Sequence, residues 1–311
     1  MKPLLASLRR IRENVIPFAQ WETLLMRLFC SFHFYDTLPH RVTFATMPFP
    51  NGLAGVIDFT FLAEPGLWPI LRALSIPCLT AYTLGLFSLP ALTYLVALIV
   101  SYGTLRNSQG AIGHSTQLLA LVMLAQWAMS LVDLARKPRK LSASWRTDPA
   151  GQRLMIHAAR VLIAAAYLTT AISKIDRSNG RWLLDTPNLS VQIVKTQAND
   201  YYNTLEPTKP AFVQELPDLI AEHPNLARMF FAPGLIIELF FPLALLGRRW
   251  SASMGLAAIG LHRSIELLMG LSFASHEVLL WIFFVNVPYW IAKGLALAFR
   301  RLRIAPDAQP N

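Results

Sequence analysis

Ionisable side chains interrupt several long apolar runs of this sequence, and their types are those that enzymes use to move protons. Four of them are Lys174, His114, His262 and His276. Lysine and histidine act as general bases and acids in many active sites. A charged side chain at bilayer depth costs about 2.5 to 3.5 kcal/mol on insertion scales, so each of these residues needs a reason to be there. They are the candidate catalytic or binding residues of the sequence.

Lys174 lies on a helix face that repeats every seven residues. Arg160, Tyr167 and Lys174 share this spacing, which keeps them on one face with about 20° of drift per heptad. Ala164 and Ala171 lie on the same face, and small residues allow a neighbouring helix to approach closely. We therefore predict that Lys174 points into a helix bundle rather than into lipid.

Three acids, Glu238, Glu266 and Glu277, accompany these basic residues in the predicted spans. Glu238 falls near the middle of another apolar run. Glu266 follows His262 by four residues, so the two are neighbours on one helix, and Arg263 can pair with Glu266 at a separation of three. Structural explanations stay open beside the functional ones. Lys174 near a helix end can snorkel to the headgroups, and a membrane histidine can hydrogen-bond a neighbouring helix.

The composition places these residues in a membrane. Hydrophobic residues make up 54% of the 311 residues and charged residues 15%, with a mean hydropathy of +0.41, whereas soluble domains carry about 25% charged residues. The net charge is +10, but the basic residues lie mostly in short clusters between apolar runs. We therefore expect a lipid bilayer and not nucleic acid as the partner. Cys30 and Cys78 lack the spacing of a thiolate metal site, and no metal site is predicted.

The apolar runs predict an all-α fold, a polytopic membrane helix bundle with about eight transmembrane helices in a single domain of residues 1–311. A helix needs about 20 apolar residues to cross roughly 30 Å of hydrocarbon. The first predicted span is the weakest, because it contains Glu22, Arg27 and Asp36. The predicted spans are 17–37, 67–87, 89–105, 111–134, 154–175, 230–247, 250–270 and 274–297.

Lys and Arg residues accumulate in alternate connections, and this sets a predicted orientation. Because cytoplasmic loops carry the excess of basic residues, both termini are expected in the cytoplasm of a bacterial inner membrane, with a basic C-terminal tail at 298–311. The long connections 38–66 and 176–229 then lie on the outer side, and we expect the second to form a helical lid. The same orientation brings the four candidate residues from four helices to one depth in the outer half.

Three segments resemble one known family. The run Tyr-Leu-Thr-Thr-Ala-Ile-Ser-Lys-Ile-Asp at 167–176, followed by Trp182, resembles the Tyr-Phe-x-Ala-Gly-x-x-Lys-Leu-Asp-x-x-Trp segment of the vitamin K-dependent gamma-carboxylases and their bacterial relatives, the horizontally transferred transmembrane (HTTM) domain proteins. Gly-His-Ser-Thr-Gln-Leu-Leu-Ala-Leu at 113–121 is similar to that family's Asn-His-Ser-Tyr-Leu segment. The run that starts at His262 and reaches Gly270 is similar to its His followed by an apolar helix and a Gly-containing turn. Order and spacing agree over roughly residues 20 to 300.

The resemblance implies quinol chemistry. In that family the Lys that matches Lys174 deprotonates a reduced quinone, oxygen converts the anion into a strong base, and a glutamate deprotonated by that base captures carbon dioxide. His114 and His262 would orient the reacting groups or stabilise developing anions. The implied cofactors and co-substrates are reduced vitamin K or menaquinol, O2, and CO2 or bicarbonate. The residues expected to contact the cofactor are Tyr167, His276 and Glu238.

Some positions depart from the family pattern. Gly113 stands where the family has Asn, Thr170 and Ala171 occupy the small-residue positions, and residues 177–181 lengthen the gap to Trp182. The β-rich extracytoplasmic domain that holds the substrate propeptide in the carboxylase has no counterpart in these 311 residues. We expect the retained part to be the quinol and oxygen chemistry.

Three classes of function remain at this point. The leading interpretation is a quinol-using, oxygen-dependent membrane enzyme, a carboxylase or epoxidase that acts at the outer face on a protein or peptide. The alternative is a non-enzymatic membrane partner for the export, maturation or immunity of a peptide. A haem or metal redox protein would require His pairs on both sides of the iron. The three candidate histidines share one predicted depth, which does not favour that third class.

Overall fold

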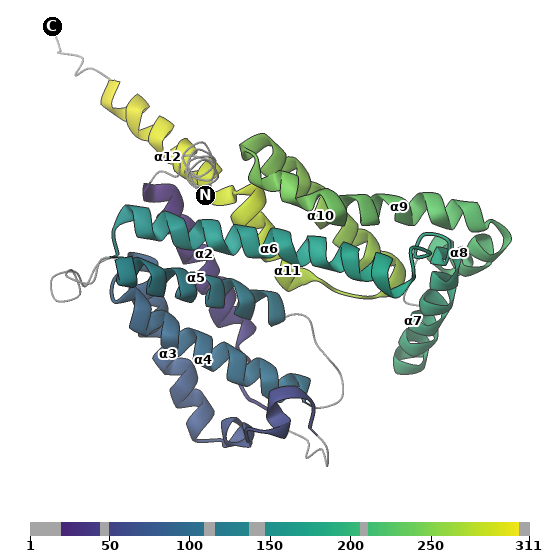
Figure 1. Cartoon of the computed structure of the whole chain (residues 1–311), viewed down its shortest axis with the longest axis horizontal. Helices are drawn as coiled ribbons and strands as arrows, with labels where there is room; N and C mark the ends of the chain where they lie inside the picture. The colour runs from purple at the N-terminus through teal and green to yellow at the C-terminus, as the bar shows by residue number, and fades with distance from the viewer. Residues whose placement is uncertain (1–19, 44–49, 109–115, 137–146, 206–210, 305–311) are drawn as a thin grey trace, which may run out of the picture. The chain divides into compact units, whose positions relative to one another are not determined.

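The computed structural model describes residues 20–43, 50–108, 116–136, 147–205 and 211–304, and over these residues the chain is helical without any β-strand (Figure 1). The all-α prediction is therefore confirmed for the described part of the chain. The α-helices are α2 (Gln20–Thr37), α3 (Leu67–Leu84), α4 (Ser88–Asn107), α5 (Gln117–Arg136), α6 (Pro149–Arg177), α7 (Leu189–Thr204), α8 (Ala211–Glu222), α9 (Pro224–Phe240), α10 (Arg248–Met269), α11 (Ala274–Leu280) and α12 (Val287–Ile304).

Short helical turns connect or extend some of these helices. The 3-10 turns are η1 (Gly52–Gly55), η2 (Thr60–Ala63), η4 (Thr186–Asn188) and η5 (Phe241–Leu245), and a π-helical turn spans Trp281–Val285.

The described parts of the predicted spans fall largely on helical segments, and five stretches are long and apolar enough to cross a membrane. These five are α3, α4, α5, α6 and the segment Pro224–Leu245, which joins α9 to η5. The segments 274–285 and 287–295 are long and apolar enough to cross a membrane only when taken together, and the chain bends by 49° between them. The described chain is thus an integral membrane protein with several transmembrane helices.

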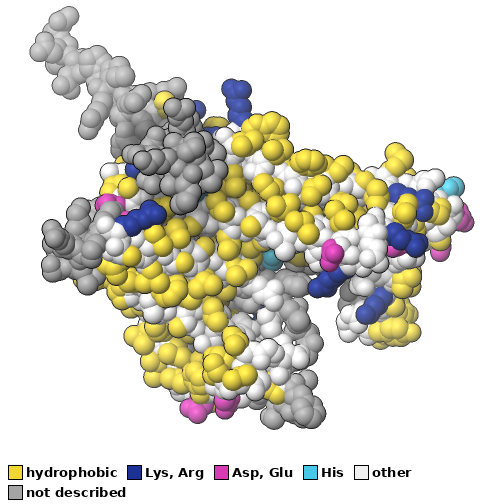
Figure 2. Space-filling view, in the orientation of Figure 1, with side chains coloured by type: hydrophobic (Ala, Val, Ile, Leu, Met, Phe, Trp, Pro, Cys, Tyr) yellow, Lys and Arg dark blue, Asp and Glu magenta, His cyan; other side chains and the backbone are white. Residues whose placement is uncertain are grey.

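The surface of the long helices is apolar, as a lipid environment requires. Large hydrophobic side chains that stand at least half exposed include Ile70, Phe87, Ile172, Ile236 and Phe240. Figure 2 shows hydrophobic side chains over much of the visible surface of the long helices, with charged side chains near helix ends. Soluble proteins rarely expose contiguous apolar surface on this scale. The exposed side chains of the five apolar stretches are therefore suited to contact with lipid.

The sharp reversal between α3 and α4 follows from its glycine. Gly85 ends α3 in the left-handed region at φ 75°, where a residue without Cβ is unstrained, and its N–H bonds the carbonyl of Ala81. Phe87 also has a positive φ of 44° immediately before α4 begins at Ser88. Three residues therefore suffice to turn the chain back.

The described contacts divide the chain into two compact units, which we describe separately. The first comprises residues 1–162 and 281–311. In it α4 packs against both α3 and α5, and α2 packs against α3 and α12. Its interior includes Met26, Cys30 and Leu95, together with the buried hydrogen bond from the Tyr82 hydroxyl to Gln126.

The second unit, residues 163–280, contains the C-terminal half of α6, helices α7 to α11 and η5. There α10 packs against α7, α9, η5 and α11, and α7 packs against α8. Side chains from four helices form one buried apolar cluster. Its members are Ile193, Val213, Ile220, Ala227, Leu268 and Met269. The connection between α6 and α9 is therefore folded into helices that share a core with α9 and α10.

Candidate functional site

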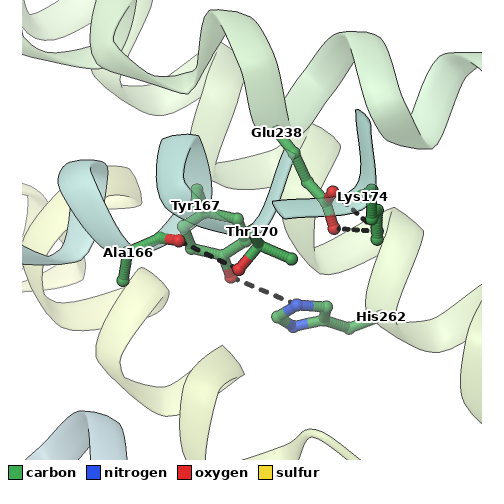
Figure 3. Close-up of polar contacts among 6 residues, drawn as sticks. All are labelled: Ala166, Tyr167, Thr170, Lys174, Glu238 and His262. Carbon is green, nitrogen blue, oxygen red and sulfur yellow. Dashed lines mark hydrogen bonds and ion pairs between the residues drawn. The ribbon is translucent and has the colours of Figure 1, made fainter. Parts of the chain in front are cut away.

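Lys174 forms an ion pair with Glu238 in the second unit (Figure 3). The Lys174 ammonium Nζ donates hydrogen bonds to both carboxylate oxygens of Glu238, at 2.7 and 2.6 Å. The Glu238 side chain is 8% exposed and the Lys174 side chain 29%. A buried carboxylate without a partner is costly, so this contact stabilises both groups. Lys174 thus contacts a carboxylate on a neighbouring helix instead of a headgroup.

The local sequence of α6 and α9 explains how the two side chains meet. Ala164 and Ala171 are buried on the same face of α6 as Lys174, and their small size lets other helices come close. On α9, Gly234 precedes Glu238 by one turn, and a Cβ at Gly234 would lie 3.0 Å from Leu261 Cδ1 on α10. Glycine at this position therefore permits the close packing of α9 on α10.

Tyr167, one heptad before Lys174 on α6, contacts His262 on α10. The Tyr167 hydroxyl and His262 Nε2 are hydrogen-bonded at 3.1 Å, and the direction of the bond depends on the tautomer of the ring. His262 is 5% exposed, and its Nδ1 has no hydrogen-bond partner among the described residues. Phe241 stacks on Tyr167 at 4.3 Å and Phe273 stacks on His262 at 4.8 Å between ring centroids. The stacked Phe241 and Phe273 rings thus give the Tyr167–His262 pair apolar surroundings.

His276 and its neighbour Glu277 lie on the other side of His262. The His276 ring meets His262 edge-on at 5.9 Å between centroids. Glu277 is buried and accepts a 2.6 Å ion pair from Arg263, which also contacts Glu266 at 2.9 Å. The predicted pairing of Arg263 with Glu266 is confirmed. The pairing of Arg263 with Glu277 was not predicted from the sequence, because the two residues lie on different helices.

An open groove lies beside the Lys174 side of the site. It has a volume of about 540 Å³ and is lined by Thr169, Thr170, Ser173, Lys174, Arg177, Ser178 and Trp182. The Lys174 ammonium sits 5.1 Å from the centre of the Trp182 ring. The Thr170 hydroxyl donates to the carbonyl of Ala166, and the Ser178 hydroxyl to that of Lys174, so their oxygens remain available as acceptors. The groove combines an aromatic wall, hydroxyl oxygens and two cations.

The structure brings together five of the six predicted site residues in this unit. Lys174 pairs with Glu238, Tyr167 bonds His262, and His276 touches His262. The sixth, His114, lies outside the described residues. Within the described part of the chain no three His, Cys, Asp or Glu side chains gather in an arrangement suited to a metal ion.

The site can move protons by two routes. The Lys174–Glu238 pair can exchange a proton over a short hydrogen bond, and the Tyr167–His262 pair can do so between a phenol and an imidazole. Both pairs lie among apolar helices, where such groups are functional candidates. No protein-family model matches the sequence, and neither a curated protein nor a solved structure matches the chain.

Proposed function

We propose that this chain is a quinol-using, oxygen-dependent membrane enzyme, similar to the transmembrane core of the vitamin K-dependent carboxylase family. The observation that carries the proposal is the Lys174–Glu238 ion pair beside the Tyr167–His262 hydrogen bond, on one face of an apolar helix. The proposal includes eight transmembrane spans, with α7 and α8 as a helical lid on the outer side.

The groove beside Lys174 fits a quinol headgroup. Trp182 offers a flat apolar face, and the hydroxyls of Thr169 and Ser173 can bond the headgroup oxygens. When bound, a quinol would supply the electrons that reduce O2, and the products would be a quinone epoxide and, where CO2 is captured by the substrate, a carboxylated substrate. What the protein contributes is the placement and removal of one proton from a headgroup hydroxyl.

Lys174 and Glu238 would remove that proton as a pair. Lys174 passes an ammonium proton to Glu238 along the 2.6 Å hydrogen bond, which leaves an amine and a carboxylic acid. The amine then accepts a proton from a hydroxyl bound in the groove and becomes an ammonium again. The net result is one proton gained by Glu238 and a negative charge held next to the Lys174 cation, where electrostatic attraction stabilises it.

Tyr167 and His262 would position the reacting groups. Their mutual hydrogen bond leaves His262 Nδ1 as the open nitrogen of a buried ring. A group held by Nδ1 would be fixed by the stacked Phe273 and by the edge of His276. In this role His262 orients the reacting groups or stabilises a developing anion, and it does not remove the first proton.

The test is oxygen-dependent consumption of reduced menaquinone or reduced vitamin K by the purified chain in nanodiscs. We expect turnover above a protein-free control, and bound quinone in a lipid extract of the purified protein. If quinol is consumed no faster than in empty nanodiscs and the extract holds no quinone, the enzyme proposal fails.

A second candidate is a non-enzymatic membrane partner of a peptide. It is favoured by the exposed apolar and aromatic side chains of α7 and α8, among them Tyr202, Leu205 and Phe212. Such a surface suits either the membrane interface or an apolar peptide. A chain without quinol activity that still protects or exports a peptide in cells would support this candidate over the enzyme.

The proposed orientation in a bacterial inner membrane puts both termini in the cytoplasm and predicts a labelling pattern. In a background with Cys30 and Cys78 replaced by alanine, Arg136→Cys at the end of α5 should react with an impermeant maleimide only from the cytoplasmic side. Asn203→Cys near the end of α7 should react only from the outer side. The reverse pattern in spheroplasts and inverted vesicles would overturn the orientation.

A further inference from the structure

Arg27 is a buried cation in the first unit, and little in the described structure balances it. The residue is 1% exposed, and its Nη2 donates one long hydrogen bond of 3.4 Å to the Ser88 hydroxyl. The guanidinium lies over the Tyr82 ring, 4.7 Å from its centre. Among the described residues Nε and Nη1 have no hydrogen-bond partner, and no carboxylate lies within ion-pair distance.

A guanidinium in this situation is costly. Moving an unpaired charge out of water costs several kcal/mol even after the protein relaxes. Proteins usually avoid the cost with a carboxylate neighbour or by snorkelling the charge to water. Arg27 does neither, because it is buried and the contacts of its guanidinium are a hydroxyl and an aromatic ring. The missing element is a negative charge.

The surroundings of Arg27 supply further donors and no competing anion. Ser88, the first residue of α4, accepts hydrogen bonds from Arg27 and from the Thr147 hydroxyl, so its own hydroxyl hydrogen is left to donate. In the first turn of α4, Pro90 has no N–H, and the Ala91 N–H bonds the carbonyl of Phe87. The N–H groups of Ser88 and Leu89 are therefore left to donate at the positive end of the helix dipole. Gly85 leaves room for two donor side chains to lie next to each other, since a Cβ there would clash with Gln152 Nε2 and lie 3.1 Å from Arg27 Nη1.

We propose that Arg27, Ser88 and the first turn of α4 bind a phosphate group, either inorganic phosphate or the headgroup of a phospholipid. A guanidinium presents a planar fork of N–H donors that matches phosphate oxygens, and helix N-termini bind phosphate through their backbone N–H groups. The bound group supplies the charge that Arg27 lacks. The site lies entirely in the first unit, apart from the Lys174 site in the second unit.

The test is the thermal unfolding of the full-length protein in detergent at constant ionic strength. Sodium phosphate replaces sodium chloride in one series, and phosphatidic acid replaces diacylglycerol, which lacks a phosphate, in mixed micelles in another. At about 100 times the dissociation constant, ligand binding to the folded state should raise Tm by about 5 °C. A rise with phosphate alone identifies a free anion, and a rise with phosphatidic acid alone identifies a lipid.

Two variants tie the shift to Arg27. Arg27→Gln should abolish the shift in Tm. Arg72→Gln is the matched control, because the Arg72 guanidinium also lies over a tyrosine ring, 4.3 Å from the centre of Tyr35, but Arg72 is less buried. This control variant should keep the shift. If Arg27→Gln does not fold, Arg27→Lys keeps a charge without the planar fork and should weaken binding at least about 10-fold. No shift of the wild-type Tm in either series, or an equal shift in the Arg27 variant, would overturn the proposal.

Discussion

The Lys174→Arg protein is expected to fold and insert but to lose at least about 100-fold of its quinol oxidation, the usual contribution of a positioned general base. Arginine keeps the positive charge that faces Glu238, so the ion pair survives. The guanidinium does not release its proton near neutral pH, so it cannot act as the amine that accepts the quinol proton. The measurement is oxygen-dependent consumption of reduced menaquinone in nanodiscs.

Matched variants separate the base role from a loss of structure. Lys293→Arg makes the same substitution beside Tyr289 and Trp290 and should keep full activity. Lys174→Ala should be partly rescued by a small exogenous amine, because the groove beside Lys174 is open. His262→Ala and His114→Ala should slow turnover without amine rescue. Full activity in Lys174→Arg would show that the residue supplies only charge.

The second large effect concerns the stability of the Lys174–Glu238 pair. Lys174→Met leaves a carboxylate that is 8% exposed without its cation, and we expect a loss of about 3 kcal/mol in the free energy of unfolding. Glu238→Gln should cost less, because the Lys174 side chain is 29% exposed and can keep some water. The double variant Lys174→Met/Glu238→Gln should recover about 2 kcal/mol relative to the sum of the single changes.

An exposed ion pair in the same unit provides the control for this cycle. Arg181 and Asp185 are separated by 3.8 Å with side chains 69% and 46% exposed, so their coupling should be close to zero. Unfolding of all variants can be followed by circular dichroism as detergent composition is changed. Additive single effects at Lys174 and Glu238 would show that the contact contributes nothing to folding.

The sequence predicted the helices well because their signals are local. Apolar runs of membrane length located the five stretches that are long and apolar enough to cross a membrane, and the heptad of Tyr167 and Lys174 placed both on one face of α6. Local sequence signals could not predict the partner of Lys174. Glu238 lies 64 residues further along the chain, and only the tertiary fold brings the two side chains together. Glu238 was predicted as a cofactor contact, and its pairing with Lys174 was not foreseen.

The bend near Asn286 is the main difference from the predicted spans. A single helix was expected over 274–297, whereas α11 passes into a π-helical turn and a 49° bend before α12. Asn286 sits at this break with a positive φ of 61°. Pro288, in the first turn of α12, was the available signal, since proline favours the start of a helix. Because the sequence is strongly apolar on both sides of Asn286, it was predicted as one continuous span despite Pro288.

This break also constrains how the protein is made. The segment before it has 12 residues and the apolar part after it nine, so neither reaches the roughly 20 residues that a helix needs to enter a bilayer by itself. At the break, the Asn286 amide donates to Glu22 on α2, and α12 packs against α2. The ribosome synthesises α2 more than 200 residues before this partner, as their separation of 264 shows. Helix α2 is therefore synthesised early but can complete its contacts only after Asn286 and α12 have been synthesised. The final packing of this unit has to wait for the C-terminal part of the chain.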